Sequence, residues 1–192
     1  MALSLATYTL RMKYCTQCGG TVSKSIPQGD NRERFVCGHC QHIHYQNPRI
    51  IAGCLPFFED QVLLCRRAIE PRRGMWTLPA GFLENGESIS DGAVRETLEE
   101  ANARVRVDSI YTIFSLPHIS QVYVFYRAQL LDLDFSAGEE SLETKLFREQ
   151  EIPWDLLSFA AIEQTLTAYF SDLKHGQYQL REGTIDPRIT TG

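Results

Sequence analysis

The chain has 192 residues, of which 43% are hydrophobic, and a formal net charge of −5 at pH 7. This length allows a sizeable buried core and fits one medium-sized domain with a small additional one. The weak negative charge, without a long run of one sign, argues against nucleic acid as a partner, and no apolar run is long enough to span a membrane.

The first residues, 1–11, are predicted to be a loosely held leader. They are mildly apolar, but no basic residue precedes the apolar part and no cleavage site is clear, so they do not match a signal peptide. Met12 is a plausible alternative start. Without a signal peptide, and with thiols expected to stay reduced, the protein is expected to be cytoplasmic.

The segment 12–46 is predicted to be a zinc ribbon. Its two C-x2-C pairs flank residues 19–36, and their thiols belong to Cys15, Cys18, Cys37 and Cys40. This spacing is typical of structural zinc, and four thiolates complete a tetrahedral shell, so the metal is expected to fold the segment and not to catalyse. Two reduced dithiols or a disulfide framework are the alternative, and a cytoplasmic location disfavours disulfides.

The remaining cysteines and the histidines of the ribbon are predicted not to bind the metal. Cys54 and Cys65 lie inside apolar strand patterns and are predicted to be small buried hydrophobic residues. His39, His42 and His44 are expected at the surface, because four thiols suffice for the metal.

Beyond the ribbon, the hydrophobic pattern predicts a mixture of strands and helices. Pro48 marks the joint, because the residue before a proline is pushed to extended geometry. Strands are predicted at 50–58, 62–65, 76–79, 104–114 and 121–131, with a hairpin turn at 59–61. Helices are predicted at 88–102, from Pro153 and at 162–173, while 140–147 is ambiguous and the tail 175–192 is expected to be loose.

The most informative pattern lies on the predicted helix 88–102, which Ser88 or Ser90 can cap. Glu96, Glu99 and Glu100 are spaced i, i+3, i+4, so they project from one side, where like charges repel by roughly 0.2–0.5 kcal/mol per pair. A hard divalent cation removes this repulsion, and Mg²⁺ binds a few carboxylates together with substrate phosphates. The pattern therefore predicts a phosphate-chemistry site built on a helix.

Residues 81–103, here called the box, resemble the Nudix box G-x5-E-x7-R-E-U-x-E-E-x-G-U, in which U is a bulky aliphatic residue. The opening Gly81 and all five charged positions match, namely Glu87, Arg95, Glu96, Glu99 and Glu100. Thr97 and Ala103 stand where bulky aliphatic residues are usual, and Asn102 stands where the second glycine is usual. Asn102 ends the predicted helix, and Asn is the next-best residue after Gly for the left-handed conformation expected there.

The resemblance covers about residues 48–173 and implies an α/β/α sandwich with a mixed sheet, preceded by the small zinc ribbon. The expected organisation is a leader at 1–11, the ribbon at 12–46, the Nudix domain at 47–174 and a tail at 175–192. A ribbon in front of this domain is similar to the arrangement in NADH pyrophosphatases and a related group of zinc-ribbon Nudix hydrolases.

The resemblance also implies roles for the box residues. The three helix glutamates would bind Mg²⁺ or Mn²⁺, together with the backbone carbonyl of Ala80, and this is the part that the residues themselves predict. Glu87 and Arg95 would form an ion pair that fixes the loop against the helix, with a contact from Arg95 to phosphate as the alternative. The general base would be a box glutamate or a carboxylate of a later loop, where Glu139, Glu140 and Glu143 are candidates unless they are simply solvated.

The substrate is indicated by residues 111–126. NADH pyrophosphatases carry an S-Q-P-W-P-F-P-x-S array that this chain lacks, whereas ADP-ribose pyrophosphatases have a proline about 15 residues past the box, which Pro117 matches. The layout is most similar to zinc-ribbon enzymes that act on ADP-ribose or FAD, with Pro117 and His118 near the site. Aromatic rings that could stack on a base belong to Trp76, Phe82, Tyr123 and Phe125.

The expected function is therefore metal-dependent hydrolysis of the pyrophosphate bond of ADP-ribose or FAD, releasing AMP. An NADH pyrophosphatase, an RNA-cap hydrolase and a non-catalytic nucleotide-sensing protein are the alternatives, and the complete set of box carboxylates favours an enzyme. Enzymes of the ADP-ribose type are commonly homodimers, which makes a homodimer the expectation here. Phe57 and Phe58 are candidate interface residues.

Overall fold

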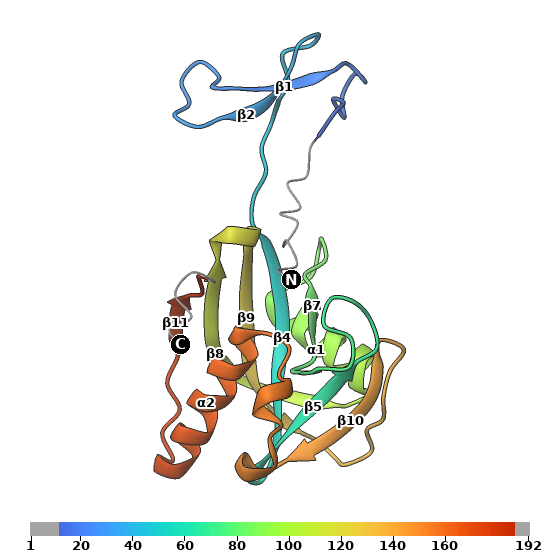
Figure 1. Ribbon diagram of the computed structural model, residues 1–192, viewed down its shortest axis with the longest axis vertical. Helices are drawn as coiled ribbons and strands as arrows, with labels where there is room; N and C mark the ends of the chain where they lie inside the picture. The colour runs from blue at the N-terminus through green and yellow to red at the C-terminus, as the bar shows by residue number, and fades with distance from the viewer. Residues whose placement is uncertain (1–11, 187–192) are drawn as a thin grey trace, which may run out of the picture. The chain divides into compact units, whose positions relative to one another are not determined.

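The computed structural model describes residues 12–186, which fall into two compact units divided between Pro48 and Arg49 (Figure 1). The predicted leader 1–11 lies outside the described residues. None of the described helices has the length and apolarity that a membrane crossing requires.

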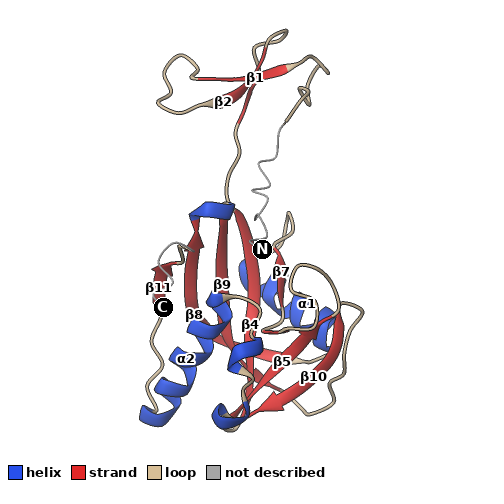
Figure 2. Ribbon diagram, in the orientation of Figure 1, coloured by secondary structure: helices blue, strands red, loops and turns tan. Residues whose placement is uncertain are grey.

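The first unit contains a small antiparallel sheet in the order β1-β2-β3 (Figure 2). Its strands are β1 (Val22–Ser25), β2 (Arg34–Cys37) and β3 (Ile43–His44). Lys24, Phe35 and His44 lie opposite one another across the three strands and therefore share one face. His44 is buried beside Phe35, so the expectation that it lies at the surface is wrong.

The second unit is built on one eight-stranded sheet, in the order β10-β5-β4-β9-β8-β11. Its long strands are β4 (Arg49–Phe58), β5 (Gln61–Arg67), β8 (Val105–Leu116), β9 (Gln121–Leu130) and β10 (Ser141–Phe147). Three short ones are β6 (Trp76–Thr77), β7 (Ala80–Phe82) and β11 (Arg181–Thr184), of which β6 pairs with β5 and β7 with β4. The pairs β4–β9 and β8–β11 are parallel and the others antiparallel, so the sheet is mixed, as predicted.

The two long helices, α1 (Ile89–Ala101) and α2 (Ala160–His175), cover opposite faces of this sheet. Alternation along the strands explains why: Ile51 and Leu55 of β4 pack in the core under α2, whereas Ala52 and Cys54 pack in the core under α1. Figure 1 shows α2 in front of the sheet and α1 behind it. The predicted α/β/α sandwich is confirmed.

Three short 3-10 helices complete the described chain: η1 (Pro117–Ile119), η2 (Glu149–Glu151) and η3 (Trp154–Leu156). The helix predicted to begin at Pro153 is therefore only one turn, and the last helix starts afresh at Ala160. The ambiguous segment 140–147 contains the edge strand β10.

Phe57 and Phe58, the candidate interface residues, are each partly buried against the core, on opposite faces of the sheet. The described part of the predicted tail is not loose, because β11 pairs in parallel with β8, and the folded domain therefore extends past residue 174.

Candidate active site

The helix α1 holds the box residues and is capped at both ends. Ser88 is the N-cap, and its side-chain oxygen accepts a hydrogen bond from the backbone N–H of Asp91. Asn102 is the C-cap in the left-handed conformation, with φ of 47°, and its N–H donates to the carbonyl of Leu98. The predicted boundaries and the predicted conformation of Asn102 are confirmed.

Arg95 ties the loop before α1 to the helix. Its Nε and Nη2 donate to both carboxylate oxygens of Glu87, at 3.1 and 2.8 Å, and Nη2 also donates to the carbonyl of Phe82 at 3.1 Å. The Arg95 guanidinium holds the pKa of Glu87 down to about 2. This bidentate pair fixes the geometry of the loop. Gly92 permits it, since a Cβ there would come within 2.9 Å of Glu87 Oε1.

The three helix glutamates share one side of α1 but differ in burial. Glu96 and Glu100 are largely buried, whereas the side chain of Glu99 is 60% exposed. Arg95 Nη1 lies 2.7 Å from Glu96 and 3.4 Å from Glu99. Glu100 instead is buried against the sheet, near Ala80.

Burial raises the pKa of Glu100 to about 8, and the neighbouring charge of Glu96 adds to the rise. Burial likewise raises the pKa of Glu96. The charge of Arg67 and a hydrogen bond from the Ala80 backbone oppose the rise at Glu100. Two buried carboxylates that disfavour each other's ionised forms are stabilised by a cation, and hard oxygen donors suit Mg²⁺ or Mn²⁺. The residues present therefore fit a divalent metal.

Gly81, the first residue of the box, is required by close approach. A Cβ at this position would overlap the carboxylate of Glu96. The glycine on β7 thus lets the strand backbone lie directly against a helix carboxylate, at the place where the carbonyl of Ala80 was predicted to bind metal.

The loop before β10 brings a further carboxylate to the helix. Ser136 N–H donates to the carbonyl of Ala101 at 2.9 Å, and Gly138 N–H donates to that of Glu100 at 3.0 Å. Glu140 follows at once, and its charge contributes to the raised pKa values of Glu96 and Glu100. Glu143 lies further along β10 and pairs with Arg66 at 3.8 Å. The structure therefore brings Glu140 to the box and does not bring Glu143 there.

The predicted substrate residues separate into exposed and buried ones. Pro117 and His118 are exposed on η1, between β8 and β9. Trp76, Tyr123 and Phe125 lie in the core, Trp76 with its ring edge-on to Phe147, so none of them offers a free face for stacking. They are buried because they lie on the face of the sheet that α2 covers.

Phe82 is the predicted aromatic residue that stays open. It is 49% exposed on β7, at the start of the box, and the guanidinium of Arg49 lies 5.3 Å from its ring centroid. Arg67, whose charge acts on Glu100, was not among the predicted site residues. The signal for it was the Arg66–Arg67 pair directly after a buried strand.

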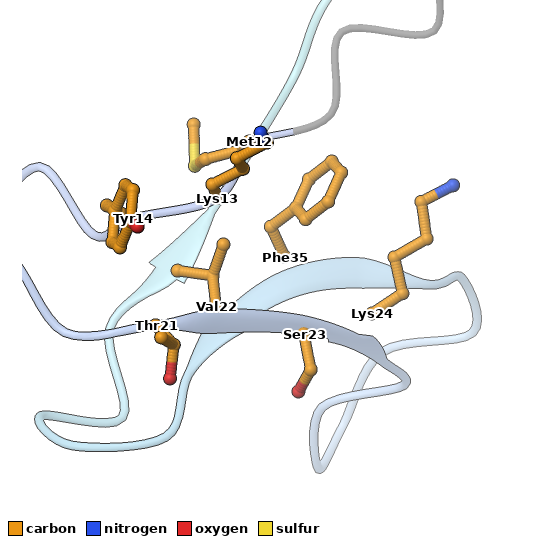
Figure 3. Close-up of a pocket in the computed structure, with 8 residues that line it drawn as sticks. All are labelled: Met12, Lys13, Tyr14, Thr21, Val22, Ser23, Lys24 and Phe35. Atoms are coloured by element: carbon orange, nitrogen blue, oxygen red, sulfur yellow. The ribbon is translucent and has the colours of Figure 1, made fainter.

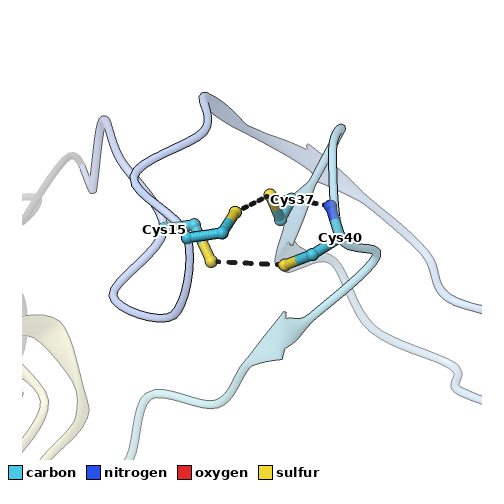
Figure 4. A group of neighbouring side chains, drawn as sticks. Cys15, Cys37 and Cys40 are labelled. Carbon is cyan, nitrogen blue, oxygen red and sulfur yellow. Dashed lines mark hydrogen bonds between the residues drawn. The ribbon is translucent and has the colours of Figure 1, made fainter.

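The four ribbon cysteines form the second site. Cys15 Sγ lies 3.7 Å from Cys40 Sγ, and Cys18 Sγ lies 3.5 Å from Cys37 Sγ, with all four sulfurs within 4.8 Å of one another (Figure 4). Tetrahedral zinc with bonds of about 2.3 Å requires sulfurs about 3.8 Å apart. Backbone N–H groups of Cys40 and His39 point at Cys37 Sγ and lower its pKa to about 6. Among the described residues, this is the one group of three or more potential ligands that converges so closely.

Comparisons with known families agree with this division of the chain. A family model described as the NUDIX domain matches residues 47–170, and one described as Nudix N-terminal, a zinc ribbon, matches residues 13–46. The chain belongs to the Nudix hydrolase family.

Among solved structures, a NUDIX hydrolase from Nitrosomonas europaea is 57% identical with a TM-score of 0.88, covering 91% of this chain and 99% of that one. The Nudix relative named NAD-capped RNA hydrolase NudC, from Vibrio parahaemolyticus, is 29% identical over 89% of this chain and 66% of its own length. An ADP-ribose pyrophosphatase from Methanocaldococcus jannaschii is 25% identical over 57% of this chain and 67% of its own. The chain thus spans 66% of the length of two NudC relatives from Vibrio species and 57% or less of other NudC relatives that it matches.

Proposed function

We propose that this Nudix hydrolase cleaves the P–O–P bridge of ADP-ribose or FAD and releases AMP. The observation that carries the proposal is the side of α1 on which buried Glu96 and Glu100 lie next to each other, with Glu140 acting on both. Such a group of carboxylates is suited to binding a divalent metal beside a phosphate chain.

Each residue of the site has a separate part in this reaction. Glu96, Glu99 and Glu100 would hold Mg²⁺ or Mn²⁺ together with the carbonyl of Ala80. When bound, the metal supplies charge neutralisation on the phosphates, a more acidic water and a stabilised leaving phosphate. Glu140 is the proposed general base, since it belongs to a loop fixed against the end of α1.

Other residues position the reactants. The Arg95–Glu87 pair holds the loop that carries Phe82 and the opening of the box. Phe82 offers an exposed ring on which adenine or flavin could stack. Pro117 and His118 are proposed to contact the substrate beyond the bridge, as in the ADP-ribose group that the sequence resembles.

A substrate panel tests the proposal. ADP-ribose, FAD, NADH, CoA and dinucleoside polyphosphates are compared with Mg²⁺ and with Mn²⁺, and AMP is expected with ribose 5-phosphate or FMN. Reaction in ¹⁸O-water shows which phosphorus is attacked, because the label appears on one product phosphate. NADH turnover at least roughly tenfold more efficient than both ADP-ribose and FAD would refute the proposed substrate.

NAD-capped RNA is the second candidate substrate, because two relatives named NAD-capped RNA hydrolase NudC match 89% of this chain. The ribbon also has a hollow lined by Lys13, Lys24, Phe35 and the 63%-exposed Tyr14, with no carboxylate in its lining (Figure 3). Lysines beside an exposed aromatic ring suit a single-stranded backbone. The expectation that nucleic acid is no partner is therefore not retained.

Charge reversal in this hollow separates the two candidates. The double variant K13E/K24E should lower cleavage of NAD-capped RNA and leave cleavage of free NADH and ADP-ribose unchanged, because the lysines are proposed to hold the RNA backbone, which the small substrates lack. Equal cleavage of the capped RNA by variant and wild type argues against a role of the ribbon in holding RNA.

We also propose that the protein is a homodimer. Phe57 and Phe58 are each partly buried against the core, so they leave little exposed aromatic surface for an interface. Light scattering at micromolar concentration should give twice the chain mass of 21.9 kDa, and a 21.9 kDa particle would contradict the proposal.

A further inference from the structure

Asn102 does more than end the helix. Its side-chain Nδ2 faces three acceptors of a loop that lies more than thirty residues further along the chain: Ser136 O at 3.2 Å, Ser136 Oγ at 3.1 Å and Ala137 O at 3.4 Å. A glycine at this position would provide the same left-handed backbone and none of these contacts. The residue therefore adds a tether that the helix cap itself does not need.

The tethered loop lies in direct backbone contact with the end of α1. The amides of Ser136 and Gly138 donate to the carbonyls of Ala101 and Glu100, which have no partners of their own at a helix end. Gly138 is required there, because a Cβ would overlap the carbonyl oxygen of Glu99. The loop therefore packs closely against the end of α1 that carries Glu99 and Glu100.

The loop leads straight into Glu140, whose carbonyl accepts a hydrogen bond from Ala68 N–H at 2.8 Å. Glu140 is thus held between two fixed points, the end of α1 on one side and the β5 end on the other. Its charge acts on Glu96 and Glu100, and the loop determines how far it lies from them. A loosened loop would let this carboxylate move away from the bridge to be cleaved.

We propose that Asn102 is a positioning residue, which holds the loop 136–140 against α1 and so places Glu140 for proton transfer from the attacking water. The inference rests on the proposed function for its catalytic part, while the tether itself is a property of the fold. Asn102 touches neither substrate nor metal in this assignment and acts only through the loop.

Amide hydrogen exchange tests the tether without any substrate. N102G keeps the helix cap and loses the amide, and N102D keeps the shape and loses both N–H donors. Exchange of the 136–141 amides should rise at least about fivefold in both variants. The matched control is E59G, which also replaces a left-handed residue by glycine, in the turn between β4 and β5. Exchange in 136–141 equal to that of wild type would overturn the proposal.

Kinetics test the route through Glu140. N102G should lower kcat roughly tenfold with KM changed less than about twofold, whereas E59G should change neither. In an E140Q background, N102G should lower kcat no further, because the carboxylate it positions is gone. A further decrease of the same size in that background, or wild-type kcat in N102G alone, overturns the proposal.

The two levels of failure are distinguishable. If the wild-type protein cleaves none of the substrates of the panel, the proposed function fails, and hydrogen exchange still decides whether Asn102 tethers the loop. If the wild type is active and exchange rises in N102G while kcat is unchanged, the proposed function stands and the positioning role is refuted.

Discussion

Glu99 and Glu100 are neighbours in sequence, yet they meet different surroundings. The side chain of Glu99 is 60% exposed, whereas Glu100 is buried against the sheet beside Glu96. A raised pKa means that the folded state disfavours the charged carboxylate relative to the unfolded chain. Glu100 therefore lowers the stability of the metal-free fold at neutral pH, as expected of a group kept for its function.

This contrast predicts different effects of two similar substitutions. Glu100→Gln and Glu99→Gln should each lower hydrolysis by orders of magnitude, because each removes one proposed anionic metal ligand. Without added divalent metal, Glu100→Gln should raise Tm, since it removes the cost of burying an ionisable carboxyl group, and Glu99→Gln should leave Tm nearly unchanged. AMP release and thermal melts measure both effects. Activity within about twofold of wild type in either variant would remove that residue from the site.

The approach of β7 to α1 gives a second prediction. Gly81→Ala should abolish most activity while the chain still folds, because the new Cβ must displace the Glu96 carboxylate. Gly183→Ala is the matched control, since its Cβ would meet only the Phe114 ring at an ordinary 3.4 Å. Hydrolysis rates together with circular dichroism decide. A Gly81→Ala variant as active as Gly183→Ala would show that Glu96 can shift without consequence.

At the scale of elements, β11 is held by charge and hydrogen bonds more than by apolar burial. Asp172 of α2 accepts a hydrogen bond from Tyr111 of β8 at 2.8 Å and forms an ion pair with Arg181 of β11. The three elements therefore meet at one carboxylate. The sequence of this strand, Arg-Glu-Gly-Thr, has no apolar alternation, which is why the tail was expected to be loose.

This junction predicts how stability depends on pH. Arg181, assisted by Tyr111, holds the pKa of Asp172 below its usual value. A lowered folded pKa contributes stability that is complete above the unfolded value, about 4, and is lost as pH falls through the folded value. The free energy of unfolding of the wild type, measured with urea, should therefore decrease more steeply below about pH 4 than that of Asp172→Asn. The control Asp155→Asn, at an exposed residue, should follow wild type.

The elements that the sequence predicts are those whose signal is local. The continuous apolar run at 50–58, the alternation along 121–131 and the caps Ser88 and Asn102 lie within a few residues of what they determine. The carboxylates of α1 follow from helical spacing alone. The tether from Asn102 to Ser136 and the burial of Trp76 depend instead on contacts between distant segments, which spacing does not encode.

At the scale of the whole molecule, the ribbon has few buried apolar residues to hold it, among them Phe35, beside two buried thiols. One tightly held zinc per chain is therefore expected, and elemental analysis of protein purified without added metal should find about one equivalent. Cys37→Ser should lose zinc and unfold the ribbon while the sheet of the second unit keeps its Tm. Cys54→Ala, at a buried thiol outside the cluster, should keep the zinc. A folded ribbon without metal would contradict the expectation.

The parallel pairing of β4 with β9 also has a consequence for the order in which the chain folds. Arg49 pairs with Gln121, a separation of 72 residues (121 − 49), whereas Val22 of the ribbon pairs with Cys37 only 15 residues on (37 − 22). Closing the longer loop costs more entropy and slows pairing. During synthesis the ribbon can fold first. The strand β4 can already pair with β5 on one side, but the backbone N–H and C=O groups along its other edge stay unpaired until β9 emerges. Misfolding and aggregation should begin at this unpaired edge.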